Sequence, residues 1–199
     1  IKASGNLDGD VYKWSATVDG NNIDLQTLKF SDTPASIEAR LSGQAEIGPG
    51  MNNIRADVSL ENLFFRRTEN TIALSDVRAH FAAFAASGVY ARMTNRDLTA
   101  EFTSPVALDS LLGGFDAVGR LVDSQIASRY IEIDTLRRTL PPFNFTLNGS
   151  NSNLINDILR PSDSGLRSIR LRARNDSTLA LNGRILDFNA GTTRIDTIY

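Results

Sequence analysis

His80 is the only histidine of this 199-residue chain, so it is the first residue to weigh for acid–base or metal chemistry. A catalytic or metal-bound histidine needs a carboxylate or a second histidine beside it. Along the sequence only Asp76 offers such a partner, and His80 takes a polar position between the apolar Ala79 and Phe81. We therefore expect His80 to have no catalytic or metal-binding role.

Two acidic stretches are the next candidates for chemistry. Asp8–Asp10 and Asp19–Asp24 resemble parts of calcium-binding loops. Neither has the full ligand spacing with a closing glutamate, and hairpin turns use the same residue types. We expect turns there rather than metal sites.

Signatures of enzymes are missing from the sequence. The chain contains no cysteine, no Gly-x-Ser-x-Gly motif and no Walker phosphate loop. Its carboxylates are scattered over alternate positions, and no two of them can be assigned as an acid and a base. We therefore expect a protein that is not an enzyme and that uses no cofactor or metal.

Arginine supplies 18 of the 21 basic residues. Arg170, Arg172 and Arg174 would share one face of a strand, and Arg66–Arg67 and Arg137–Arg138 form two pairs. One interpretation is contact with phosphate or carboxylate, which guanidinium groups bind in a bidentate manner. The other is that aspartates and glutamates on neighbouring strands pair with the arginines, which suits the net charge of −2. That near-neutral charge also argues against a nucleic-acid partner.

The elements that carry these residues show a period of two. From Ala35 to Ile47 every odd position is apolar or glycine, and every even position is polar. Because side chains alternate across a strand, this stretch has one apolar and one polar face. The sequence Gly-Pro-Gly at 48–50 ends it, and Ile54–Leu60 repeats the alternation.

The same alternation recurs along the chain and predicts about a dozen antiparallel strands. Asp19–Asn22 is a turn signal, which predicts a hairpin between Tyr12–Val18 and Ile23–Phe30 with a bulge near Gln26 and Thr27. Further strands are expected around Thr71–Phe84 (with a change of phase), Val89–Met93, Leu98–Phe102, Phe143–Leu147, Ile169–Ala173, Leu179–Leu181 and Thr193–Tyr199.

One segment changes to a helical period. Ser104 followed by Pro105 predicts a helix start, with Ser104 as the N-cap, and apolar residues then recur at three- and four-residue steps to about Arg129. Shorter helices are expected at Thr135–Leu140, capped by Asp134, and at Ser152–Leu159.

The chain is expected to form one continuous domain. Residues 1–103 and 161–199 are sheet segments, and residues 104–160 are a helical insertion with a short strand. No apolar run approaches the ~18 residues of a membrane span. Because the chain starts at Ile1 without a methionine and stops inside an alternating pattern, we interpret it as an internal fragment of a longer protein.

An alternating strand needs something to cover its apolar face. The cover can be a second sheet ~10 Å away, the opposite wall of a barrel, or a ligand lying along a curled sheet. The apolar positions of residues 35–47 are mostly small, which favours open space unless bulky residues of another sheet or of the helix fill it. The candidate lining of such a groove is Ile37, Ala39, Leu41, Ala45, Ile54, Ala56, Val58, Leu60, Val89, Ala91 and Met93.

Several segments together carry a family likeness. They are Ala35–Ile47, Ile54–Leu60, the helix after Ser104-Pro105, Ile133–Gly149, Ser152–Leu159 and Ile169–Asn189. With them the chain resembles the TamB and AsmA-like envelope proteins of Gram-negative bacteria, in their Bacteroidota form. The likeness covers nearly the whole chain and lies in the strand pattern, because these families have no catalytic signature to match.

The resemblance implies a periplasmic, β-taco-like antiparallel sheet whose apolar groove carries phospholipid between the inner and outer membranes. It also implies a role in outer-membrane protein assembly, an inner-membrane anchor, and an outer-membrane barrel partner of the TamA or BamA type that contacts regions outside this chain. The helix at 105–129 departs from a uniform groove and would plug it or cover its opening.

Two other functions stay open. A β-sandwich with a filled core would be a binding or adhesion module that acts through loops such as Gly48–Asn53 or Pro161–Gly165. An assembly scaffold would instead add strands of a client barrel protein to its exposed sheet edges.

Overall fold

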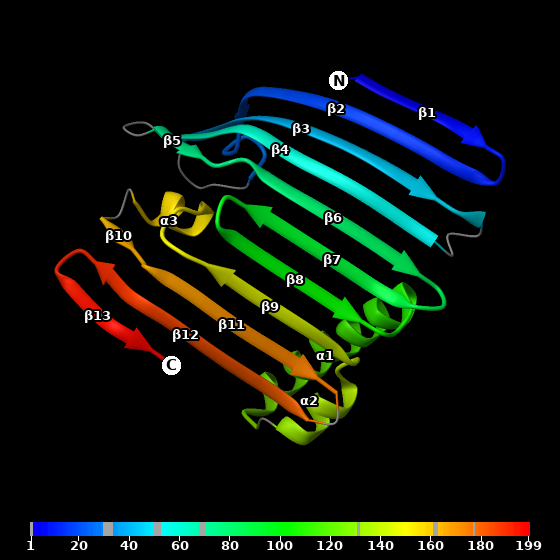
Figure 1. Cartoon of the computed structure of the whole chain (residues 1–199). Coiled ribbons are helices and arrows are strands. Elements are labelled where there is room, and N and C mark those ends of the chain that lie inside the picture. Colours follow the sequence, from blue (N-terminus) through cyan, green and yellow to red (C-terminus); the bar gives the residue numbers. More distant parts are fainter. Residues whose placement is uncertain are drawn as a thin grey trace.

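The strands of the chain join in one antiparallel sheet of 13 strands in the computed structural model (Figure 1). The structure describes residues 2–29, 34–49, 53–67, 71–130, 132–160, 163–176 and 178–199. Strand order largely follows the chain, as β1-β2-β3-β4-β6-β7-β8-β9-β11-β12-β10, while β5 pairs with β4 and β13 with β12. This confirms the expected fold class, a mostly β chain built on a long open antiparallel sheet with one helical insertion.

The elements have the following bounds. The strands are β1 (Lys2–Asp8), β2 (Val11–Asp24), β3 (Ala35–Ile47), β4 (Asn53–Arg67), β5 (Thr71–Leu74), β6 (Val77–Phe84), β7 (Gly88–Asn95), β8 (Leu98–Ser104), β9 (Phe143–Gly149), β10 (Ser164–Gly165), β11 (Ser168–Asn175), β12 (Leu179–Ala190) and β13 (Thr193–Ile198). The helices are α1 (Leu108–Ser128), α2 (Ile133–Thr139) and α3 (Leu154–Leu159).

The pairing register keeps like residues on like faces across the sheet. Residues that lie directly opposite on neighbouring strands share a face, so one register row can be followed from β2 to β12. The central apolar row is Ala16, Gly43, Val58, Ala79, Met93, Ala100, Leu147, Leu171 and Gly183. The adjacent polar row is Ser15, Gln44, Asp57, His80, Arg92, Glu101, Thr146, Arg172 and Asn182. The sheet therefore has one apolar face and one polar face.

The expected hairpin turn at Asp19–Asn22 is wrong. β2 runs through these residues, and its pairing with β3 resumes at Ile23 after a bulge that begins at Gly20. The turn comes later, where the Asp24 carboxylate accepts hydrogen bonds from the backbone N–H groups of Gln26 and Thr27. The sequence placed the turn and the bulge in the opposite order, because glycine and asparagine serve both structures.

The expected cap of the long helix is also wrong. Ser104 belongs to β8, and α1 begins at Leu108 after Ala107 without a side-chain cap. The Ser104 hydroxyl donates instead to the Pro142 carbonyl at 2.7 Å, which ties together the two ends of the 105–142 insertion. The later short helix, α3, begins at Leu154 instead of the expected Ser152, and the Asn153 side chain caps it. Asp134 is the second residue of α2, not its cap.

Both helical connections fold back onto the apolar face. α1 packs at the end of the sheet where β8 ends and β9 begins, and α3 packs at the opposite end of the same strands (Figure 1). One buried cluster consists of Ala83, Val89 and Leu111 under α1, and a second consists of Leu98, Leu166 and Ile169 near α3. The packed core is therefore small, and both clusters are centred on the strands from β6 onward, while Ala35 of β3 and Leu63 of β4 are the buried apolar residues of the earlier strands.

Candidate functional site: the apolar face of the sheet

The apolar face of β1–β4 is exposed. Trp14, Leu41 and Val58 lie on it with 50%, 44% and 39% of their surface open to solvent. Leu7 and Tyr12, which lie opposite each other on β1 and β2, are more exposed still. We call these five residues the bare patch. Over them the described residues place neither a second sheet nor a helix.

A hollow lies over the outer part of the bare patch. Its volume is about 970 Å³, and it is lined by Leu7, Tyr12, Trp14, Ala45 and Ile47 together with neighbouring residues of β1–β3. Small residues form the sheet surface beneath the hollow and beside it. Ala45 lies opposite both Trp14 and Ala56, and Gly43 lies opposite Val58. The hollow is open and mostly apolar, which suits a flexible hydrocarbon better than a rigid polar ligand.

Farther along the sheet, α1 covers one end of the apolar face. Val89 and Leu111 are each 4% exposed there, and Ile54 and Phe81 pack against them. Phe115 of α1 joins Phe102 and Phe143 of the sheet in an aromatic cluster, with ring centroids 5.9 to 6.3 Å apart. The helix is thus a packed cover of the strand ends.

At the other end, α3 covers the face and is fastened by polar contacts. Asp157 of α3 is 2% exposed in its side chain, and its carboxylate accepts hydrogen bonds from the backbone N–H and the hydroxyl of Ser75. Arg160 and Arg96 lie 2.9 and 3.7 Å from the same carboxylate. Asn95 donates its side-chain amide to the carbonyl of Ser75 and accepts the N–H of Leu154.

The structure distributes the predicted groove residues over three environments. Leu41, Ala45, Ala56, Val58 and Leu60 lie on the apolar face of β3 and β4, in direct register. Alternation along β3 places Ile37 and Ala39 on that face too, beyond a register shift of the β3–β4 pair. The remaining four are associated with the covered part: Val89 is buried under α1, Ile54 packs at its rim, Met93 packs against the cluster near α3, and Ala91 lies between them on β7.

Leu7, Tyr12 and Trp14 line the hollow but are not among the residues predicted from the sequence. Tyr12 and Trp14 showed the same alternation, so the signal was present. Their inclusion required the β2–β3 register, in which Tyr12 faces Ile47 and Trp14 faces Ala45.

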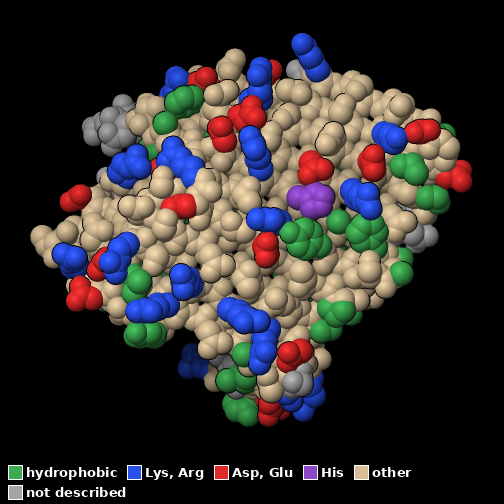
Figure 2. Space-filling view, viewed as in Figure 1, with side chains coloured by type: hydrophobic (Ala, Val, Ile, Leu, Met, Phe, Trp, Pro, Cys, Tyr) green, Lys and Arg blue, Asp and Glu red, His purple; other side chains and the backbone are tan. Residues whose placement is uncertain are grey.

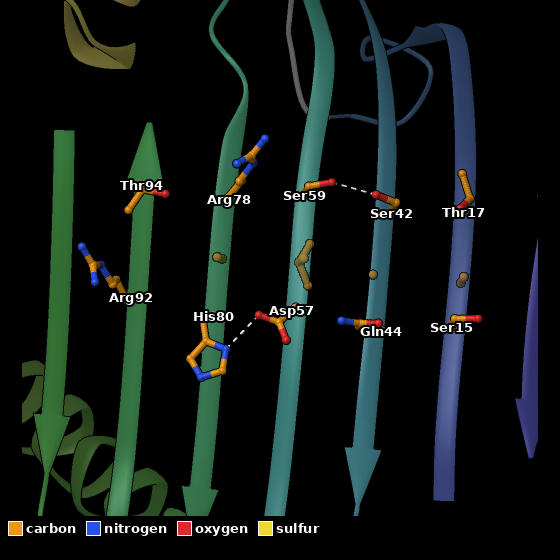
Figure 3. A pocket seen from close by; sticks show the side chains of 14 residues that line it. Ser15, Thr17, Ser42, Gln44, Asp57, Ser59, Arg78, His80, Arg92 and Thr94 are labelled. Carbon is orange, nitrogen blue, oxygen red and sulfur yellow. Dashed lines mark hydrogen bonds and ion pairs between the residues drawn. The ribbon is translucent and has the colours of Figure 1, made fainter. Parts of the chain in front are cut away.

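The polar face carries a second hollow, of about 520 Å³, over β2 to β7 (Figure 3). His80 lies in it, and its Nδ1 is 2.8 Å from an Asp57 carboxylate oxygen. The sequence offered Asp76 as the carboxylate partner, but Asp76 accepts the N–H of Asn62 instead. Asp57 is found only through the β4–β6 register, which sets it opposite His80. Both side chains are well exposed.

The acidic stretches that resembled calcium loops use their carboxylates internally. Asp8 pairs with Lys13 at 2.8 Å, and this hydrogen bond and charge lower the pKa of Asp8. Asp19 accepts from Arg40 at 2.6 Å, which lowers the pKa of Asp19 in the same way. Asp24 is held by Thr27 and the adjacent backbone. In the part of the chain that the structure describes, no group of three or more acidic or histidine side chains is placed to hold a metal ion.

Within the described ranges, none of the helices has the length and apolarity needed to cross a bilayer.

No protein-family model, curated protein or solved structure matches this chain.

Proposed function

We propose that this chain is a periplasmic segment of a TamB/AsmA-like envelope protein, and that its apolar face holds phospholipid acyl chains in transit between the inner and outer membranes. The observation that carries the proposal is the bare patch. Trp14, Leu41 and Val58 stand half-open to solvent on a sheet that has no second layer above them.

Leaving this apolar surface in contact with water is energetically unfavourable. Burying a large apolar side chain contributes about 1.5–3 kcal/mol, and contiguous exposed apolar patches on soluble proteins mark sites of interaction. An acyl chain gains about 0.8 kcal/mol for each CH₂ group that it buries. Such a chain needs no hydrogen-bonding partner, and Gly43, Ala45 and Ala56 on this face of β3 and β4 have no polar side chain to offer one.

The helices fit this function as end covers. α1 and α3 cover parts of the apolar face from β6 to β11 at opposite ends, whereas most of that face on β1–β4 stays open. In this proposal acyl chains lie on β1–β4 with their headgroups toward the polar rim, and α1 limits how far they reach along the sheet.

Trp14 provides a built-in test because it is the only tryptophan of the chain and belongs to the bare patch. The experiment titrates the protein with phosphatidylcholine whose acyl chains carry bromine, and with the unbrominated lipid as reference. Bromine quenches tryptophan fluorescence on contact. We expect strong quenching by the brominated lipid alone.

Two adjacent substitutions form a matched control. Ala45→Arg places a charge on the apolar face opposite Trp14, whereas Gln44→Arg places the same side chain on the polar face. We expect Ala45→Arg to reduce quenching at least fivefold and Gln44→Arg to leave it unchanged. Circular dichroism establishes that both variants fold. Absence of quenching in the folded wild type, or equal quenching in both variants, contradicts the proposal.

A role in outer-membrane protein assembly is favoured by a separate observation. β1 is exposed along all seven residues and pairs with β2 alone among the described strands. A free strand edge can accept a further strand through backbone hydrogen bonds. A photocrosslinker at Ser4 of β1, in the full-length protein in its envelope, should capture nascent barrel proteins, whereas one at Thr17 of the interior β2 should not. Equal capture from both positions argues against strand addition.

A further inference from the structure

Four arginines gather on the polar face of β11 and β12. Arg170, Arg172 and Arg174 occupy alternate positions of β11, and Arg184 lies on β12 directly opposite Arg170. All four are exposed. We call them the arginine patch. Figure 2 shows Lys and Arg side chains clustered over these strands, with few acidic groups among them.

Several other arginines of the chain have acidic partners, but those of the arginine patch do not. Arg92 lies 3.4 Å from Glu101, and Arg167 lies 2.8 Å from Asp187. Within the described residues, none of the four arginines of the patch forms an ion pair or a side-chain hydrogen bond. Arg184 lies over the Tyr199 ring, 5.5 Å from its centroid, a contact that leaves its charge without a counterion. The second interpretation of the sequence, neutralisation by cross-strand carboxylates, therefore does not apply to these four.

The immediate neighbours of the arginine patch are neutral hydrogen-bonding residues. On the β9 side Arg170 faces Asn148, Arg172 faces Thr146 and Arg174 faces Asn144, and on the β12 side Arg172 faces Asn182. Like charges that lie directly opposite on neighbouring strands, as Arg170 and Arg184 do, destabilise a sheet. The arrangement thus carries an electrostatic cost that an anion lying between the two guanidinium groups would remove.

A hollow is present at this point. Its volume is about 400 Å³, and Arg170, Arg172 and Arg184 line it together with Thr146, Asn148 and Asn182. Guanidinium groups donate paired N–H bonds that match the geometry of phosphate oxygens. Three cations around one hollow exceed what a single carboxylate can neutralise, whereas a phosphate monoester carries nearly two negative charges and three acceptor oxygens.

We propose that the hollow within the arginine patch binds a phosphate group. The site lies on the face opposite the bare patch, so it does not hold the headgroup of an acyl chain lying there, and it stands independently of the lipid proposal. The phosphate belongs either to a soluble ligand or to the headgroups of an anionic membrane surface, and the chemistry is the same for both.

The first arm of the test follows thermal unfolding of the whole chain with inorganic phosphate, at constant ionic strength set with chloride. A ligand that binds only the folded state raises Tm as its concentration exceeds Kd. We expect a saturable rise for the wild type. Arg172→Gln should weaken the apparent affinity at least tenfold, because it removes the guanidinium between Arg170 and Arg174.

Arg78→Gln is the matched control. Arg78 lies on the same polar face and also has no ion pair among the described residues, but it faces Ser59 and Thr94 instead of another arginine. Phosphate also stabilises proteins by general exclusion from their surface, and that effect would be equal in all three proteins. An equal rise of Tm in wild type, Arg172→Gln and Arg78→Gln therefore overturns the proposal.

The second arm separates the two sources of phosphate. Vesicles that contain phosphatidic acid are floated with each protein and compared with vesicles of phosphatidylcholine alone. Flotation that needs phosphatidic acid and is lost in Arg172→Gln supports a membrane source. Saturable binding of inorganic phosphate without flotation supports a soluble ligand. If neither occurs with the folded wild type, the proposal is wrong.

Discussion

The two halves of the sheet have the same alternating strands but different surroundings. On β1–β4 most of the apolar face is bare, and Trp14 and Leu41 are about half exposed. From β6 to β11 helices cover parts of the same face at both ends, and Val89, Leu98 and Leu111 are nearly inaccessible. The difference comes from the connections between strands. Among the described residues no helix lies between β1 and β4, whereas the β8–β9 and β9–β11 connections contain helices. In this fold, coverage is thus a property of the loops and not of the strands.

The largest expected effect compares one leucine from each half. Leu111→Ala removes a side chain packed between α1 and the sheet, and should lower the free energy of unfolding by about 2–4 kcal/mol. Leu41→Ala removes a half-exposed side chain of the bare patch, and should cost less than about 1 kcal/mol. Urea unfolding measures both. Similar losses in the two variants would mean that the bare patch is covered in solution.

A second prediction concerns how the α3 cover is fastened. Asp157→Ala leaves the buried N–H of Ser75 without its acceptor, and should destabilise the protein by about 2 kcal/mol in urea unfolding. Asp116→Ala is the control, because Asp116 pairs with Arg120 on the exposed surface of α1 and should cost under about 0.5 kcal/mol. Equal costs would show that Asp157 does not anchor α3.

A smaller loss is expected at the cap of the same helix. The Asn153 side chain accepts the N–H groups of Ile155 and Asn156 at 3.0 and 3.2 Å. Asn153→Ala should lower stability by about 1 kcal/mol. Asn151→Ala, at an exposed position in the preceding turn, should leave the urea midpoint nearly unchanged. Hydrogen exchange should show the difference confined to α3 and the strands under it.

The smallest effect is a pH dependence at Asp97. Partial burial raises the pKa of Asp97, but hydrogen bonds from Ser150 and from the Ser152 N–H outweigh it and bring the pKa below its usual value. A lowered folded-state pKa means that the carboxylate contributes stability above pH 3.8, which is lost as pH falls through the folded-state value. Acid unfolding should therefore be less steep in Asp97→Asn than in wild type. Identical acid transitions in the two proteins would show that the Asp97 carboxylate does not contribute to the pH dependence of stability.

Much of the fold could be predicted because alternation is a local signal. Ala35–Ile47 and Ile54–Leu60 were placed correctly, since each residue type reports which face it takes. The end of β2 was misplaced, because Gly20 and Asn22 suit a bulge as well as a turn. Phe30, the last residue of the expected hairpin, lies outside the described part of the chain.

The candidate site was predicted less completely, because it depends on contacts between distant residues. The pairing of His80 with Asp57, and the covering of Val89 by Leu111, follow from register and from the path of an insertion. Neither can be read from spacing along the chain. The arginines of β11 were visible in the sequence, but the absence of carboxylates beside them required knowledge of β9 and β12.

The nearly sequential strand order makes the sheet behave like a one-dimensional array. Along most of it each strand is hydrogen-bonded to only two neighbours, so stability approximates a sum of adjacent pair terms, as in repeat proteins. A further hairpin added at the β1 edge would meet a ladder of the same kind and would disturb nothing beyond its first neighbour. Length in this architecture is therefore a freely adjustable variable, and the span that such a sheet bridges can change by whole hairpins.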